Sequence, residues 1–212
     1  MPINPSMILK GLALGLGAAV PIGPVNVEIA RRVLRSGFRH GFALGCGAVS
    51  VDVTYAIMSS LGVRSLLDRP HLRMMIAIAG LVLLVALGVL SIRGALHDLH
   101  TDPLSQPEPT ANIHGAYLTG LLMTLLNPMT LAFWFLTVPG TVGSITRDPA
   151  HDLPVVCAGV FAGTIAWVIF FCTLLTLLGR LRRRWWLAAA DIIGGLLLFG
   201  FAAAIGWQLL RA

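Results

Sequence analysis

Pro21-Ile22-Gly23-Pro24 interrupts an apolar run over residues 8–30, and Asn127-Pro128 interrupts a second apolar run over residues 116–138. Proline has no amide hydrogen, and its ring clashes with the carbonyl one turn earlier, so each break leaves backbone polar groups without helical partners. In hydrocarbon such groups are costly unless other protein groups or a water-filled cavity satisfy them. In transporters built from repeats, helices broken in this way point to the substrate site.

The composition is typical of an integral membrane protein. Hydrophobic residues make up 57% of the 212-residue chain and charged residues 11%, whereas a soluble domain carries about 25% charged residues. A helix needs roughly 20 apolar residues to cross the bilayer core. Stretches of about that length fill most of the chain: 8–30, 41–63, 74–92, 116–138, 155–178 and 187–209. The sequence therefore predicts an all-α integral membrane protein with six transmembrane helices.

A polar, proline-rich linker over residues 94–115 divides the chain into two halves. The first half, 1–93, and the second half, 116–212, each hold three expected spans and begin with an interrupted helix. Because three is an odd number, the second unit inserts in the opposite orientation to the first. This pattern predicts a single membrane domain, 1–212, of two inverted three-helix repeats, with helices 1 and 4 interrupted by proline.

The positive charge of the chain lies mostly between the expected spans. The net charge is +6, and arginines follow the first span at Arg31, Arg32, Arg35 and Arg39. This is the positive-inside pattern of a multi-pass membrane protein rather than a nucleic-acid surface. It places the loops after spans 1, 3 and 5 in the cytoplasm and both termini outside. We expect the lipid bilayer, and no nucleic acid, as a partner.

Few ionisable side chains fall inside the expected spans, and such residues usually face a cavity and mark a pathway or proton relay. Asp52 lies about eleven residues into the second span, so we expect it to exchange protons at a cavity; the alternative is a structural, protonated carboxyl. Glu28 follows the first break and is a second candidate for proton coupling. Its alternative is an ion pair with Arg31 and Arg32, which lie on the same helical face. Asp191 is more typical of a boundary carboxylate.

Substrate-binding candidates lie at the two breaks. Asn26 and Asn127 flank the breaks, and an amide can offer donors and an acceptor to a zwitterion; each could instead repair the broken backbone. A helix that starts after a proline also has free amide hydrogens that suit a carboxylate. The expected substrate-binding residues, which include two tryptophans within spans 4 and 5, are Gly23, Pro24, Asn26, Asn127, Pro128, Trp134 and Trp167.

Enzymatic motifs are missing from the sequence. It contains no H-E-x-x-H, G-x-S-x-G or P-loop pattern, so we expect no enzyme, no cofactor and no bound metal. The three cysteines, Cys46, Cys157 and Cys172, lie within apolar spans as packing residues. Glycine pairs of the form G-x-x-x-G, such as Gly11 with Gly15, let helices approach closely and would permit a homodimer.

Three motifs in order resemble the lysine-exporter (LysE/RhtB-type) family of small amino-acid exporters. They are Pro21-Ile22-Gly23-Pro24-Val25-Asn26 with Arg31, Arg32 and Gly37; Gly45 and Gly47 with Asp52; and Leu126-Asn127-Pro128 with Phe133-Trp134-Phe135. The resemblance implies a bacterial inner-membrane carrier of two inverted halves that exports amino acids or related metabolites, driven by the proton motive force. It also implies functional roles for Gly23, Pro24, Asp52, Asn127 and Pro128.

The chain departs from the family pattern at three places. Met129 stands where many members have lysine, and Glu28 stands where many have an apolar residue. Ala132 and Phe133 stand where exporters of basic amino acids can carry an acid, which weakens the case for lysine or arginine as substrate. The sequence therefore favours a proton-coupled antiporter of amino acids or similar small molecules.

Two other functions remain open at this stage. A divalent-metal exporter is possible because distant relatives handle cations, although hard cations want several oxygen ligands and only Asp52 and Glu28 lie at depth. A membrane scaffold without transport would close the two broken helices onto each other, and a cavity between them would count against it.

Overall fold

The computed structural model describes residues 5–60, 70–100, 112–137, 149–179 and 184–211. Almost all of these residues are helical. The helices are α1 (Pro5–Ala19), α2 (Pro24–Ser36), α3 (Phe38–Ser60), α4 (Pro70–His100), α5 (Ile113–Leu125), α6 (Pro128–Ala132), the π-helical turn η3 (Phe133–Thr137), α8 (Pro149–Leu178) and α9 (Arg184–Arg211).

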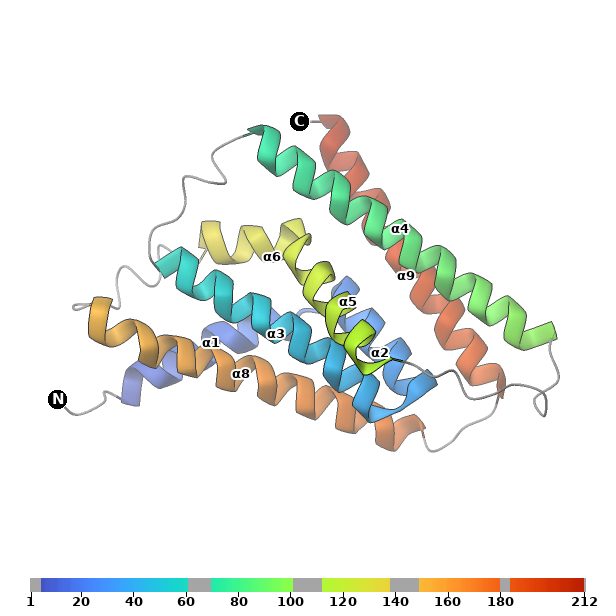
Figure 1. Cartoon of the computed structure of the whole chain (residues 1–212), viewed down its shortest axis with the longest axis horizontal. Helices are drawn as coiled ribbons and strands as arrows, with labels where there is room; N and C mark the ends of the chain where they lie inside the picture. The colour runs from blue at the N-terminus through green and yellow to red at the C-terminus, as the bar shows by residue number, and fades with distance from the viewer. Residues whose placement is uncertain (1–4, 61–69, 101–111, 138–148, 180–183, 212) are drawn as a thin grey trace.

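The helices form two groups, which Figure 1 shows from the side. In one group α1 packs along α8, and α3 packs between α5 and α8; in the other, α4 and α9 pack along each other. The short helices α2 and α6 lie between the groups, where α2 contacts α9 and α6 contacts α4. The broken segments therefore meet between the two helix groups, although Ile22 of the first break is 74% exposed.

Both breaks expected from proline are present. The first is a bend of 77° between α1 and α2, and the second is a bend of 55° between α5 and the α6–η3 segment. Each outgoing helix begins with its proline, Pro24 or Pro128, as the first helical residue. Proline is favoured at that position because its amide hydrogen would have no helical partner anyway.

Glycine makes the sharp corner between α2 and α3. Gly37 has a φ of +86°, a conformation that glycine adopts readily and other residues rarely do. Its amide donates to the Val33 carbonyl at 3.0 Å, which closes α2, and α3 starts at the next residue. The chain turns back within one residue, so α3 packs directly against α2.

Three described helices are long and apolar enough to cross a membrane: Phe38–Ser60, Met74–Arg93 and Asp152–Leu178. Counting each bent pair as one span raises the number to five. The sixth expected span, 187–209, falls on α9, whose described apolar part, Ile192–Trp207, is shorter than the other spans. The structure thus supports a multi-pass helical membrane protein with three to five candidate spans, and the count of six stays a prediction.

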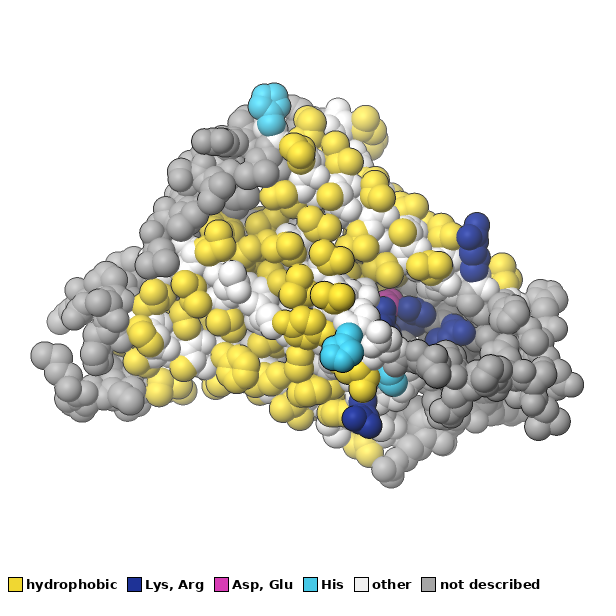
Figure 2. All heavy atoms as spheres, in the orientation of Figure 1, with side chains coloured by type: hydrophobic (Ala, Val, Ile, Leu, Met, Phe, Trp, Pro, Cys, Tyr) yellow, Lys and Arg dark blue, Asp and Glu magenta, His cyan; other side chains and the backbone are white. Residues whose placement is uncertain are grey.

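Large apolar side chains cover much of the described surface, as Figure 2 shows on one face. Ile22, Met75 and Leu90 are more than half exposed, as are several others. In water such a surface would drive association, whereas lipid tails cover it at no cost. In this view the visible Lys and Arg side chains lie toward one end of the molecule.

Glycine allows close contact within two helix pairs. A Cβ at Gly159 of α8 would lie 2.5 Å from the Ile8 carbonyl oxygen and 2.9 Å from the Gly11 Cα of α1. On α5, a Cβ at Gly120 would overlap the backbone of Leu44 on α3. Small residues at these contacts let the helix backbones touch, which is how membrane helices pack tightly.

The expected linker is only partly described. Helix α4 continues to His100, so the first residues of the interval 94–115 are helical, and α5 begins at Ile113 behind the N-cap Asn112. Residues 101–111 lie outside the described part of the chain. The division into halves at this point therefore stays a prediction.

Candidate functional site

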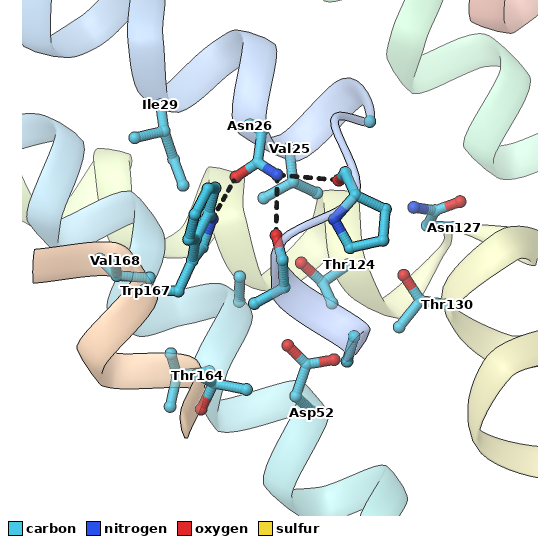
Figure 3. A pocket seen from close by; sticks show the side chains of 16 residues that line it. Val25, Asn26, Ile29, Asp52, Thr124, Asn127, Thr130, Thr164, Trp167 and Val168 are labelled. Atoms are coloured by element: carbon cyan, nitrogen blue, oxygen red, sulfur yellow. Dashed lines mark hydrogen bonds between the residues drawn. The ribbon is translucent and has the colours of Figure 1, made fainter. Parts of the chain in front are cut away.

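A cavity of about 70 Å³ lies where the two breaks meet. It is large enough for several water molecules. Both breaks contribute to its wall, together with the middle of α3 and of α8. Its polar lining side chains are Asn26, Asp52, Thr124, Asn127, Thr130, Thr164 and Trp167, and Figure 3 shows them around one space.

Asn26 holds the first break together. Its Nδ2 donates to the carbonyl oxygens of Ala19 at 2.8 Å and of Pro21 at 2.9 Å, as Figure 3 shows. Ala19 ends α1 and Pro21 lies in the break, and no backbone amide of the described residues bonds either carbonyl. The side chain is 6% exposed, and both hydrogens of its amide are used, so Asn26 satisfies backbone groups that the prolines leave open.

Trp167 completes this arrangement from α8. Its indole Nε1 lies 3.3 Å from Asn26 Oδ1 and donates to it. The indole ring stacks on Phe171, with ring centroids 5.4 Å apart and an angle of 10° between the planes. Trp167 therefore fixes the orientation of the Asn26 amide while its ring forms part of the cavity wall.

Two side chains form hydrogen bonds with backbone groups at the second break. Asn127 is the N-cap of α6, and its Oδ1 accepts a hydrogen bond from the Met129 amide at 3.0 Å. On the other side of the break, Tyr55 of α3 donates its hydroxyl to the Leu125 carbonyl at 2.8 Å. Asn127 uses only its oxygen in these contacts, and its Nδ2 lies on the cavity side in Figure 3.

Asp52 is the acidic group of the cavity. It is 7% exposed, and its carboxyl group points toward the space between the two breaks in Figure 3. One oxygen, Oδ1, accepts a hydrogen bond from Trp134 Nε1 at 2.9 Å. A carboxyl group so placed can bind an ammonium group or carry a proton.

Trp134 lies behind Asp52 rather than in the cavity wall. Its side chain is fully buried, it belongs to η3, and it is not among the residues that line the cavity. Ser59 of α3 donates to the Trp134 carbonyl at 2.6 Å. Two hydrogen bonds thus tie η3 to α3, and one of them ends on the cavity carboxyl.

Glu28 is fully buried and does not line the cavity. It receives hydrogen bonds from Arg31 at 2.7 and 2.8 Å and from Arg32 at 2.9 Å. Arg32 also donates to Thr119 of α5 at 3.0 Å. The pairing with both arginines, the alternative weighed from the sequence, is present, and a role of Glu28 in proton coupling stays a prediction.

The structure brings together five of the residues expected at a site: Gly23, Asn26, Asp52, Asn127 and Trp167 all line the cavity. Pro24 and Pro128 line a smaller neighbouring hollow with Asn127. Sequence reasoning missed Thr124, Thr130 and Thr164. Hydroxyl groups within apolar spans can face a cavity, so the three threonines could have been proposed from the sequence. Helical periodicity alone did not show toward which side of each helix their side chains point.

A metal site has little support in the described part of the chain. No group of three or more His, Cys, Asp or Glu side chains that could hold a metal ion occurs there. Asp52 is the carboxylate among the residues that line the cavity. Hard divalent cations take six or more oxygen ligands, several of them commonly carboxylates.

Comparison with known proteins gives a consistent picture along the chain. The model of the LysE type translocator family matches residues 16–208. The "Putative amino acid efflux protein YcgF" of Bacillus subtilis (strain 168) is 26% identical over 205 residues, which cover 92% of this chain and 94% of that protein. The "Chemotactic transduction protein ChpE" of Pseudomonas aeruginosa (strain PAO1) is 25% identical over 198 residues, 93% of this chain and 96% of that protein. No solved structure matches the chain.

Proposed function

Because this chain belongs to the LysE type translocator family, it is a membrane transporter and not an enzyme, and we propose that it exports amino acids or related small metabolites in exchange for protons. The substrate site is the cavity between the two breaks. The observation that carries the proposal is that both broken helices, the carboxyl group of Asp52 and the aromatic ring of Trp167 meet around this one space.

An amino acid fits the chemistry of the cavity at both of its charged ends. The carboxyl group of Asp52 is a partner for the ammonium group, since no other acid lines the cavity among the described residues. The amide of Asn127 and the hydroxyl of Thr130 can donate hydrogen bonds to the carboxylate. No lysine or arginine is among the described residues that line the cavity, which favours substrates whose side chain carries no negative charge.

Exchange follows from the two partners that Asp52 can hold. A proton and a substrate ammonium group compete for the same carboxyl group, so protonation from one side releases the substrate, and substrate binding from the other side releases the proton. Coupling requires that each partner favours a different conformation. The hydrogen bond from Trp134 Nε1 to Asp52 links the state of this carboxyl group to η3, the segment that follows the second break.

We also propose the inverted-repeat architecture, with six spans and both termini outside a bacterial plasma membrane. Its support is the pairing of helices. In the proposed repeat, α1 of the first half corresponds to α5 of the second half, and α3 corresponds to α8. The α1–α8 pair therefore corresponds to the α5–α3 pair, and both pairs are in close contact and rich in glycine. The helices of both pairs are also parallel. Gly11 and then Gly15 of α1 contact successive turns of α8. Likewise, Ser50 and then Tyr55 of α3 form hydrogen bonds with Tyr117 and then Leu125 of α5.

The proposal is tested in proteoliposomes that hold a pH-sensitive dye. Gradients of neutral, basic and acidic amino acids are imposed in turn, followed by divalent cations, and proton movement is recorded. We expect proton flux with neutral amino acids, loss of that flux in Asp52→Asn, and wild-type flux in the control Arg93→Gln, an exposed residue of α4. Flux with cations alone would replace the proposal with a metal exporter. No flux with any amino acid would reject amino acids as the substrate.

A further inference from the structure

A second hollow lies on the outside of the helix bundle, away from the substrate cavity. It is a groove of about 410 Å³ between the first turns of α3 and of α5, within the size range of ligand pockets. Most of its lining side chains are apolar or aromatic, and two carry basic groups. The lining residues are Phe38, Arg39, Phe42, Ala43, Cys46, Ile113, His114 and Tyr117.

With α3 and α5 as membrane spans, the groove would run from a membrane interface into the apolar zone. Helix α3 is a candidate span that begins at Phe38, and α5 begins beside it at Ile113. Arg39 and His114 lie within the first two residues of their helices and so at the level of lipid head groups. Cys46 lies seven residues after Arg39, which at 1.5 Å per residue is about 10 Å deeper.

The described residues at the mouth of the groove are basic, with no acid among them to balance the charge. Arg39 and His114 are both exposed, and Arg39 has no hydrogen-bond or ion-pair partner among the described residues. Among the described residues that line the groove there is no Asp or Glu. Basic pockets beside membrane helices attract the phosphate of anionic lipids, and Lys or Arg near the membrane surface strengthens this attraction.

The deeper wall suits a hydrocarbon chain. Phe38 and Phe42 stack with ring centroids 5.5 Å apart and an angle of 13° between their planes, which gives a flat aromatic wall. Ala43 and Cys46 are small and leave room opposite the side chain of Tyr117. The Tyr117 hydroxyl has its hydrogen-bond partner within the protein, because it donates to Ser50 Oγ of α3 at 3.0 Å.

We propose that this groove binds an anionic phospholipid, with the phosphate at Arg39 and His114 and one acyl chain along Phe38 and Phe42. A lipid carries both the negative charge that the mouth lacks and the apolar chain that the deeper wall accepts. The bound lipid would cover the contact between α3, which carries Asp52, and α5, which leads into the second break. This inference does not depend on which substrate the cavity transports.

The test is photo-cross-linking of the full-length protein in nanodiscs. The probe is phosphatidylglycerol with a photoactivatable group in its acyl chain, compared with the same probe on phosphatidylcholine, and labelled peptides are located by mass spectrometry. We expect labelling of residues 38–46 and 113–117 by the anionic probe. Because one arginine at the membrane surface changes lipid binding about fivefold, we expect Arg39→Gln to reduce this labelling about fivefold and His114→Gln to reduce it less.

Arg93→Gln is the matched control, since Arg93 is exposed on α4 outside the groove, and it should leave labelling of the groove unchanged. Both groove variants alter exposed side chains, so a normal size-exclusion profile is expected and confirms folding. Equal labelling by the zwitterionic probe, or unchanged labelling in Arg39→Gln, would overturn the proposal.

Discussion

Trp134 Nε1 donates a hydrogen bond of 2.9 Å to Asp52 Oδ1, across 82 residues of sequence and between the π-helical turn η3 and helix α3. Trp134 is fully buried, and Asp52 is the carboxyl group of the cavity. π-Helical turns are rare and frequently lie at functional sites. A change in the charge of the Asp52 carboxyl group alters the strength of this bond, and the bond reaches the segment that follows the second break.

Asp52→Asn should abolish proton-coupled transport and leave the fold intact. The asparagine oxygen can still accept the hydrogen bond from Trp134, so we expect thermal unfolding in detergent close to that of the wild type. Asp52→Ala is the control for this argument. It leaves the buried indole without its acceptor and should lower stability by about 1–3 kcal/mol. Wild-type coupled flux in Asp52→Asn would remove Asp52 from the mechanism.

Glu28→Gln should lower stability and leave coupled transport intact, which is the reverse of the effect expected for Asp52→Asn. The change leaves the guanidinium groups of Arg31 and Arg32 without a negative partner in a largely buried site. Breaking a buried pair by removing one partner costs about 3 kcal/mol or more. We therefore expect lower thermal stability and less folded protein, with coupled flux retained per folded molecule. A stable variant that has lost coupling would instead assign Glu28 to the proton pathway.

Asn26→Asp should destabilise the first break. The aspartate oxygens would face the carbonyl oxygens of Ala19 and Pro21, which now accept hydrogen bonds from Nδ2. Leaving two buried carbonyls without a donor costs about 2 kcal/mol or more. The thermal unfolding temperature measures this loss. An unchanged temperature would show that other groups or water satisfy these carbonyls.

Asn127→Asp is the matched change at the second break, and it should preserve the fold. Aspartate accepts the hydrogen bond from the Met129 amide as well as asparagine does at an N-cap. The change replaces the amide nitrogen on the cavity side with a negative oxygen, which repels a substrate carboxylate. We expect normal unfolding and an apparent substrate affinity about tenfold weaker, since losing a hydrogen bond to a charged group costs about 1.5 kcal/mol or more. Unchanged affinity would place the substrate carboxylate elsewhere.

Gly159→Ala should disturb the contact between α1 and α8. The added methyl group would meet the backbone of Ile8 and Gly11, which has no flexible end that can move aside. Overpacking of this kind costs about 1–3 kcal/mol, measurable as earlier thermal unfolding. The control is Gly200→Ala in α9, where an added Cβ has no neighbour within 4 Å among the described residues. Equal stability of both variants would mean that α1 and α8 are less tightly packed.

Local features of the chain were enough to predict the membrane class, the family and both helix breaks. Apolar length sets which segments can cross a bilayer, and proline acts on its own helix, so neither depends on distant residues. The family resemblance is confirmed by the match over residues 16–208. The pairing of Glu28 with Arg31 and Arg32 was also readable, because residues three and four apart share a helix face.

The roles of the two tryptophans and the two asparagines were decided by tertiary structure. Trp134 and Trp167 looked equivalent as sequence, yet one lies behind Asp52 and the other forms part of the cavity wall beside Asn26. The amide nitrogen of Asn26 donates hydrogen bonds to backbone carbonyls, whereas the amide nitrogen of Asn127 lies on the cavity side. Hydrogen bonds between distant segments depend on how α3, α8 and the two breaks pack, and helical periodicity within one segment carries no information about that packing.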